Sequence, residues 1–275
     1  MLDVGLSTCG FLFTDDNFKA LSEAGIKSIE VSRAWTEYKD LNFGEIKRLA
    51  DKYGITLWSF HLPFADPKNL DISSLNEKIR QSTVNWWCEN IKKGAEIGVK
   101  IFVAHPSSEP ISEDAEIRPQ NIAAAKKSLK ELAEFAAQYD AVIAVEDLPR
   151  SCLGRNAEEI AELVSAHPRL KVCLDTNHML TDTNLNLIKT VGDKIVTLHV
   201  SDYDFIDERH WLPGEGKIDW RELYNTILKI GYNGPWLYEI NLSAPKNIER
   251  RELTFKDFTD NANQIFNNKP LALTD

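Results

Sequence analysis

One pattern of polar and apolar positions recurs along this chain. A polar stretch, in which apolar residues return after three or four positions, ends near a glycine and is followed by a short apolar or β-branched run. The first spacing predicts an amphipathic helix, and the continuous apolar run predicts a strand that is buried on both faces. Eight strands are expected in all, within residues 2–7, 24–31, 53–61, 97–105, 139–147, 170–178, 192–202 and 231–240.

The alternation of strands and helices continues over the whole length of the chain. It predicts an α/β fold in which residues 1–275 form one domain, a (β/α)8 or TIM barrel, with a frayed tail at about residues 267–275. An open doubly wound sheet is the alternative, but the G-x-G-x-x-G signature of a dinucleotide-binding fold does not follow the first strand. The sequences that begin at Ser74 and Asp219 have capping-box spacing and predict two helix starts.

Composition and charge narrow the class of protein. The net charge of −10 gives the chain no general attraction for polyanions, which argues against a nucleic-acid partner. No segment approaches the roughly 18 consecutive apolar residues that cross a membrane, and the N-terminus lacks the basic region of a signal peptide. The four cysteines are widely spread and form no C-x-x-C motif. These features predict a cytoplasmic protein with reduced thiols and no membrane partner.

Side chains capable of chemistry follow most of the predicted strands. In a (β/α)8 barrel the carboxyl ends of all strands meet at one mouth, where crowded carboxylates and imidazoles need a compensating charge. A divalent cation is the usual compensation, and mixed ligands of this kind suit Mn²⁺, Zn²⁺, Co²⁺ or Mg²⁺. The simpler alternative is a water-filled mouth in which these groups only form hydrogen bonds. The residues expected there are Glu30, His61, His105, Glu146, Asp175, His178, His199, His210 and Glu239.

Several of these residues stand in segments that resemble the xylose isomerase-like barrels. This superfamily contains sugar and sugar-phosphate isomerases and epimerases, and also the endonuclease IV class of repair nucleases. The most specific part runs from His199 through Pro213-Gly-Glu-Gly216 to Asp219-Trp220, and Asp175-x-x-His178 is less specific. The matching segments, in order, are 59–63, 103–107, 145–147, 174–178, 198–202, 208–210 with 213–220, and 238–239.

The resemblance implies a metal-dependent enzyme. In the isomerase and epimerase branch, one divalent metal would be held by Glu146, Asp175, His199 and Glu239. The two glutamates are expected to act also as the acid and base that move a proton next to a carbonyl, while the metal stabilises the enediolate. The resemblance further implies assembly as a dimer or tetramer.

A second set of residues is expected to bind the substrate, which would be a sugar, a keto-polyol or a sugar phosphate. Glu208 stands where the nuclease class carries an aspartate, and Gly214 and Gly216 are expected to shape the loop that follows it. The predicted substrate-binding residues are His61, His105, His178, Glu208 and His210. An apolar wall for the sugar is expected from Trp35, Trp58, Phe60, Phe64 and Trp211.

Other functions remain open on this scaffold. An endonuclease IV-like nuclease would hold three metals. Each mouth residue except Glu30, and Glu208 in addition, stands at one of its ligand positions, but the acidic loops after the strands would repel DNA. A dehydratase or lyase begins with the same proton abstraction, and the fold does not decide the outcome. A non-catalytic protein that binds metal and sugar is a further alternative, against which the presence of both glutamates argues.

Overall fold

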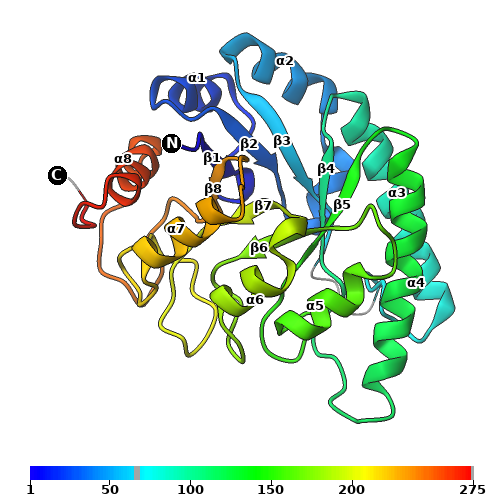
Figure 1. Ribbon diagram of the computed structural model, residues 1–275. Helices are drawn as coiled ribbons and strands as arrows, with labels where there is room; N and C mark the ends of the chain where they lie inside the picture. The colour runs from blue at the N-terminus through cyan, green and yellow to red at the C-terminus, as the bar shows by residue number, and fades with distance from the viewer. Residues whose placement is uncertain (65–68, 274–275) are drawn as a thin grey trace.

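Eight parallel strands form the inner layer of this protein, and helices surround them (Figure 1). The structure is a computed structural model and describes residues 1–64 and 69–273. Each expected strand is present within its predicted segment. The strands are β1 (Val4–Ser7), β2 (Ser28–Val31), β3 (Thr56–His61), β4 (Ile101–Ala104), β5 (Val142–Glu146), β6 (Lys171–Asp175), β7 (Ile195–His199) and β8 (Trp236–Tyr238).

The helices alternate with these strands, as the apolar spacing predicted. None of the helices within the described ranges is long and apolar enough to cross a membrane. They are α1 (Asp15–Glu23), α2 (Phe43–Tyr53), α3 (Glu77–Glu96), α4 (Arg118–Ala137), α5 (Ala157–Val164), α6 (Asn184–Val191), α7 (Trp220–Lys229) and α8 (Phe255–Phe266).

Helix α2 shows how local sequence sets these elements. The side chain of Asn42 accepts a hydrogen bond from the backbone nitrogen of Glu45 at 3.0 Å, which satisfies a free amide of the first turn. Gly54 ends the helix in the left-handed region with a φ of 66°, a conformation that glycine adopts without steric cost. Ile46 and Leu49 are buried on one face, so the helix packs onto the barrel by its apolar stripe.

Strand pairing follows the chain order, so the sheet curls into a barrel. The order is β7-β6-β5-β4-β3-β2-β1-β8, and the pairs are parallel. The remaining seam closes just beyond β7, where the backbone nitrogen of Val200 donates to the oxygen of Leu237 at 2.8 Å. The backbone nitrogen of Glu239 donates in turn to the oxygen of Val200 at 3.2 Å. The barrel is nearly closed, and its strand ends surround one mouth.

The inside of the barrel is filled below this mouth. Val103, Ala144 and Cys173 form a small apolar cluster that is separate from the main core between strands and helices. Side chains on a strand alternate between its two faces, so the next inward positions on β5 and β6 are Glu146 and Asp175. The fold therefore places the carboxylates of Glu146 and Asp175 one layer above this apolar cluster, toward the mouth.

One of the two predicted helix starts is wrong. Asn76, rather than Ser74, caps α3, and its side chain accepts a hydrogen bond from the backbone nitrogen of Lys78 at 3.1 Å. The Ser74 hydroxyl instead accepts from the backbone nitrogen of Asn76 at 3.3 Å, which makes a turn before the helix. Asp219 caps α7 as predicted and accepts from the backbone nitrogen of Glu222 at 2.9 Å.

The tail after α8 differs from the frayed end that we expected. Of that segment the structure describes residues 267–273, whereas 274–275 lie outside the described residues. The side chain of Gln264 donates to the backbone oxygen of Ala272 at 2.9 Å and accepts from its nitrogen at 3.2 Å. Leu271 packs against the core. These contacts hold the described part of the tail against the barrel.

Candidate active site

Four side chains meet at the mouth, each from a different strand end. Glu146 ends β5, Asp175 ends β6, His199 ends β7, and Glu239 directly follows β8. One nitrogen or oxygen atom from each residue lies within 4.8 Å of the others, and all four residues are buried. We call Glu146, Asp175, His199 and Glu239 the carboxylate–histidine group.

The chemistry of this group fits a divalent cation. His199 Nδ1 lies 2.8 Å from Glu146 Oε1, 3.3 Å from Glu239 Oε2 and 3.8 Å from Asp175 Oδ2. Three carboxylates thus surround one imidazole. Asp175 Oδ2 is buried without a hydrogen-bond partner among the described residues. Buried carboxylates rarely persist in this way without a compensating charge, and one histidine with three carboxylates is a donor set that Mn²⁺, Zn²⁺, Co²⁺ and Mg²⁺ accept.

Two further histidines approach Glu146 from the other side. Nε2 of His61 and Nε2 of His105 each lie 3.1 Å from Glu146 Oε2. One oxygen of this carboxylate therefore faces His61 and His105, while the other faces His199. Glu146 is the shared member of both arrangements.

A second cluster stands on the opposite side of the group. His210 Nε2 lies 2.8 Å from Glu208 Oε1, and His178 Nε2 lies 3.7 Å from the same oxygen. His178 Nε2 is also 3.6 Å from Asp175 Oδ2. His178, Glu208 and His210 offer a third set of atoms that are close enough to share one ion.

Burial and these contacts shift the pKa values of the site. Burial raises the pKa of Glu146, but the charges of His199 and His105 outweigh it and bring the pKa well below its ordinary value. Burial raises the pKa of Asp175 to about 7, although His178 opposes the shift. For His210, burial lowers the pKa, but the contact with Glu208 raises it overall to about 9. Neighbouring groups with pKa values pushed apart are typical of sites that move protons.

The loop that carries Glu208 and His210 is organised by Asp202. This buried carboxylate accepts hydrogen bonds from the backbone nitrogens of Gly214 at 2.8 Å and Gly216 at 3.0 Å. A Cβ atom on Gly216 would collide with Asp202, which explains the glycine. Asp202 also accepts from the backbone nitrogens of Tyr203 and Ile218 and from the Trp220 indole at 2.9, 3.2 and 2.9 Å. As expected, the two glycines shape the loop.

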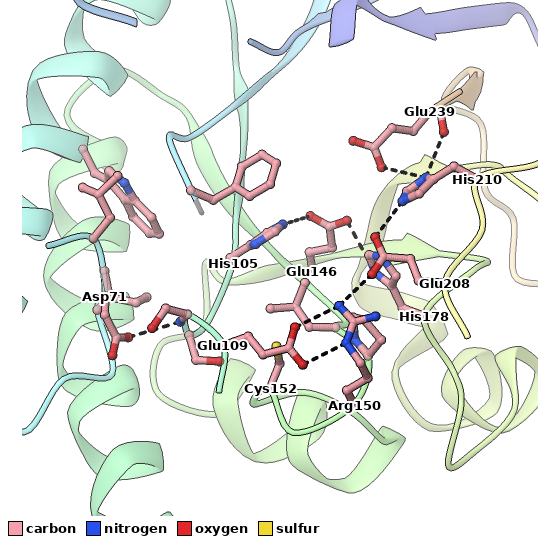
Figure 2. A pocket seen from close by; sticks show the side chains of 18 residues that line it. Asp71, His105, Glu109, Glu146, Arg150, Cys152, His178, Glu208, His210 and Glu239 are labelled. Atoms are coloured by element: carbon pink, nitrogen blue, oxygen red, sulfur yellow. Dashed lines mark hydrogen bonds and ion pairs between the residues drawn. The ribbon is translucent and has the colours of Figure 1, made fainter. Parts of the chain in front are cut away.

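A pocket of about 220 Å³ opens beside the carboxylate–histidine group (Figure 2). Of the group, Glu146 and Glu239 line the pocket, whereas Asp175 and His199 lie behind them. Its volume is small compared with the roughly 300–1,000 Å³ of pockets for drug-sized ligands, so a compact ligand fits it. One apolar wall comes from Phe64, Leu70, Ile72, Trp87, Leu148 and Pro149.

Charged side chains from three loops meet at the rim of this pocket (Figure 2). The Arg150 guanidinium lies 2.8 Å from both oxygens of Glu109, 3.0 Å from Asp207 Oδ1 and 3.0 Å from Glu208 Oε2. These loops follow β4, β5 and β7. We call Glu109, Arg150, Asp207 and Glu208 the Arg150 cluster.

The structure brings most of the predicted substrate-binding residues to the pocket. His105, His178, Glu208 and His210 line it, but His61 does not: its side chain is 1% exposed behind Glu146. Glu30 is fully buried inside the barrel.

The predicted apolar wall is largely wrong. Among the described residues, Phe64 is the one predicted aromatic side chain that lines the pocket. Trp87 of α3 contributes instead, because α3 passes beside the mouth while the other predicted aromatics lie elsewhere in the fold. Trp87 had no sequence signal beyond helical apolar spacing. Arg150 had none at all, because only the folded loops bring it to the pocket.

Comparison with curated proteins finds relatives of two kinds. The curated D-psicose 3-epimerase of Ruminiclostridium cellulolyticum is 26% identical over 235 residues, which cover 82% of this chain and 78% of that protein. A probable endonuclease 4 of Aquifex aeolicus is 31% identical over 205 residues, covering 66% of this chain and 71% of that protein. The relatives therefore include both sugar epimerases and a nuclease.

The fold and family are also clear from two wider comparisons. A solved structure described as a D-tagatose 3-epimerase-like protein superposes with a TM-score of 0.82 at 22% identity, covering 97% of this chain and 98% of that one. The family model described as xylose isomerase-like TIM barrel matches residues 18–256. This chain belongs to the xylose isomerase-like TIM barrel family.

Proposed function

We propose that this protein is a divalent-metal-dependent epimerase of an uncharged ketose sugar, and that it inverts the carbon next to the carbonyl. One observation carries the proposal: within the carboxylate–histidine group, Glu146 and Glu239 line the pocket, whereas Asp175 and His199 lie behind them. All four residues would hold the metal, and the two glutamates alone would also reach the substrate. The 3-epimerase relatives support this choice over an aldose–ketose isomerase.

Epimerisation needs a base on each face of the reacting carbon. The proton is removed from one face and a proton is returned to the other, so a single carboxylate on one side is not sufficient. Glu146 and Glu239 come from β5 and the end of β8, which β6 and β7 separate around the barrel. A divalent metal bound at this group supplies Lewis-acid polarisation of the substrate carbonyl. His105, His178 and His210 donate hydrogen bonds to substrate oxygens as negative charge develops.

The charge around the pocket supports an uncharged substrate. Among the described residues, Arg150 is the one lysine or arginine that lines the pocket. Its guanidinium already contacts Glu109, Asp207 and Glu208 at 2.8–3.0 Å. A phosphate would have to displace these carboxylates and would also meet Glu146 and Glu239. A neutral sugar incurs no such repulsion, so we favour unphosphorylated ketoses.

Deuterium exchange tests the proposal. The Mn²⁺-loaded protein is incubated in D2O with D-fructose, D-tagatose and L-ribulose in turn, and the products are examined by NMR. We expect deuterium at the carbon next to the carbonyl, together with the epimer. Glu146→Gln and Glu239→Gln should each slow exchange by about 10²- to 10⁴-fold, because each removes a proton-transfer group.

A matched control makes this test specific. Glu134→Gln is the same substitution on the exposed face of α4, where Glu134 has only a 3.9 Å contact with Lys130. It should exchange as the native protein does. The proposal would be contradicted if Glu146→Gln and Glu239→Gln both exchanged deuterium at the native rate. Loss of water from the substrate instead of epimer formation would assign a dehydratase.

A nuclease is the second candidate, because two extra sets of ligand atoms flank the central group. These are His61, His105 and Glu146 on one side, and His178, Glu208 and His210 on the other. The endonuclease 4 relative supports the same alternative. Elemental analysis of the purified protein separates the two: about one metal per chain favours the epimerase. Close to three zinc ions per chain, with cleavage of abasic-site DNA, would favour the nuclease.

A further inference from the structure

A fully buried carboxylate lies inside the barrel, on a strand that contributes no residue to the carboxylate–histidine group. Glu30 is on β2, across the barrel from His199 on β7. His199 Nε2 lies 3.0 Å from Glu30 Oε1 and 3.1 Å from Oε2. The Ser59 hydroxyl donates to Glu30 Oε2 at 2.8 Å, and the Ser7 hydroxyl is 3.4 Å from Oε1. Glu30 is therefore held on two sides while it faces the imidazole.

The two nitrogens of His199 have separate neighbours. Nδ1 faces the three carboxylates of the carboxylate–histidine group, at 2.8 to 3.8 Å. Nε2 faces Glu30. Both ring nitrogens therefore face carboxylates, Nδ1 at 2.8 Å from Glu146 and Nε2 at 3.0 Å from Glu30. A cation held on the Nδ1 side would need the lone pair of that nitrogen, so the ring proton would be on Nε2 and would be donated to Glu30.

A neighbouring ring also restricts the orientation of the His199 imidazole. It stacks on the ring of His61 with a centroid distance of 5.8 Å and an interplanar angle of 19°. Stacking limits rotation of the ring, but it does not distinguish one ring nitrogen from the other. The contact with Glu30 provides an acceptor for a proton on Nε2 when Nδ1 binds the metal.

We propose that Glu30 is a positioning residue, which selects the tautomer and orientation in which His199 binds the metal through Nδ1. This inference rests on the metal-dependent function proposed above. Burial of a carboxylate inside a barrel is unfavourable unless its partners compensate. The partners here are two serine hydroxyls and the one histidine of the carboxylate–histidine group. Carboxylates that orient metal-binding histidines in this way typically alter metal affinity by 10- to 100-fold when they are removed.

The test measures metal binding directly, apart from activity. Native protein, Glu30→Gln and Ser59→Ala are freed of metal and titrated with Mn²⁺ by calorimetry, and their Co²⁺ forms are compared by visible absorption. We expect Glu30→Gln to bind Mn²⁺ about 10- to 100-fold more weakly and to change the Co²⁺ spectrum. Ser59→Ala should weaken binding less and in the same direction, since it frees Glu30 without removing it. Glu134→Gln is the matched control and should bind as the native protein does.

The outcomes separate this inference from the function on which it rests. Native affinity and an unchanged Co²⁺ spectrum in a folded Glu30→Gln protein would overturn the role of Glu30 alone. If Glu30→Gln does not fold, Ser59→Ala decides, and native affinity in that variant overturns the inference. A native protein that binds Mn²⁺ through a Glu30-dependent site but exchanges no ketose proton would overturn the proposed epimerase and leave the role of Glu30 intact. A native protein without affinity for divalent metals would overturn both.

Discussion

Two groups of charged side chains face the same pocket, and they differ in how their charges are accommodated. In the Arg150 cluster, one guanidinium meets three carboxylates at 2.8–3.0 Å, and its members are partly exposed to solvent. In the carboxylate–histidine group, three buried carboxylates share one imidazole, and Asp175 Oδ2 has no hydrogen-bond partner in the described chain. Water screens the first group, whereas burial denies that screening to the second.

This difference separates a cluster whose charges are paired from one that leaves a buried carboxylate oxygen without a hydrogen-bond partner in the described chain. Each carboxylate at the rim has a cationic partner, so the Arg150 cluster needs nothing further to be satisfied. The carboxylates of the buried group also have histidines outside the group near them, yet Asp175 Oδ2 has no hydrogen-bond partner in the described chain, and an added cation would give it one. Burial and the unpartnered oxygen of Asp175, rather than clustered charge alone, therefore make the second group the candidate metal site.

The largest expected effect comes from the same substitution made in each group. Asp175→Asn removes a carboxylate from the buried group and should weaken Mn²⁺ binding by about 100-fold or more, since even residues behind a metal ligand cost 10- to 100-fold. Asp207→Asn changes the rim and should leave Mn²⁺ affinity near the native value. Calorimetric titration measures both. If Asp175→Asn and Asp207→Asn bound Mn²⁺ with equal affinity, the two groups would not differ in metal binding.

The next effect concerns stability. A metal that binds only the folded protein stabilises it by about 2.7 kcal/mol when its free concentration is 100 times its Kd. We expect Mn²⁺ to raise the free energy of unfolding by about this amount in urea titrations, and EDTA to reverse the gain. Arg150→Gln should show the same gain, because the rim is outside the proposed metal site. A native protein with unchanged stability would show that no such cation binds.

A smaller effect depends on pH. Burial raises the pKa of Asp175 from its ordinary value of 3.8 to about 7, which favours its protonated form in the folded chain. The stability that this shift gives the metal-free protein is full below about pH 3.8 and is lost as the pH rises through about 7. A cation binds the ionised carboxylate, so Mn²⁺ affinity should fall about tenfold for each pH unit below 7. Titrations at pH 6, 7 and 8 check this slope, and a flat profile would contradict it.

The smallest effect is expected at the rim itself. Arg150→Gln removes ion pairs that are 27–46% exposed, and partly exposed pairs contribute about 0.2–1 kcal/mol. We expect a loss of stability no larger than this, and it should shrink in 1 M NaCl. A loss of several kcal/mol would mean that the Arg150 cluster holds the loops together far more strongly than its exposure indicates.

The sequence predicted the barrel and its mouth from regular geometry, and the resemblance to the xylose isomerase-like barrels singled out the central group. Eight apolar runs give eight parallel strands, and side chains such as Glu146 and Asp175 must then rise at one end of the barrel. That argument needs strand positions and no detail of the loops. It correctly brought the strand-end residues to one mouth, and the four residues that the resemblance implied as metal ligands do lie together there.

The sequence could not predict what depends on the path of the loops or on packing between distant elements. Arg150 meets Asp207 only because the loops after β5 and β7 fold toward each other. His61 ends its strand as predicted, yet it is buried and does not line the pocket, whereas its neighbours Glu146 and His105 do. Glu30 was ambiguous because its partner, His199, is 169 residues away in the chain. Periodicity along a chain contains no information about such pairs.

The hydrogen bonds to Asp202 have an evolutionary consequence. Four of the five groups that donate to this carboxylate are backbone amides, so the course of the loop from Tyr203 to Ile218 depends little on the side chains between. Positions such as Glu208 can therefore mutate without unfolding the loop that displays them. Residues that this loop presents to the pocket can therefore be exchanged during evolution while the backbone of the loop is kept.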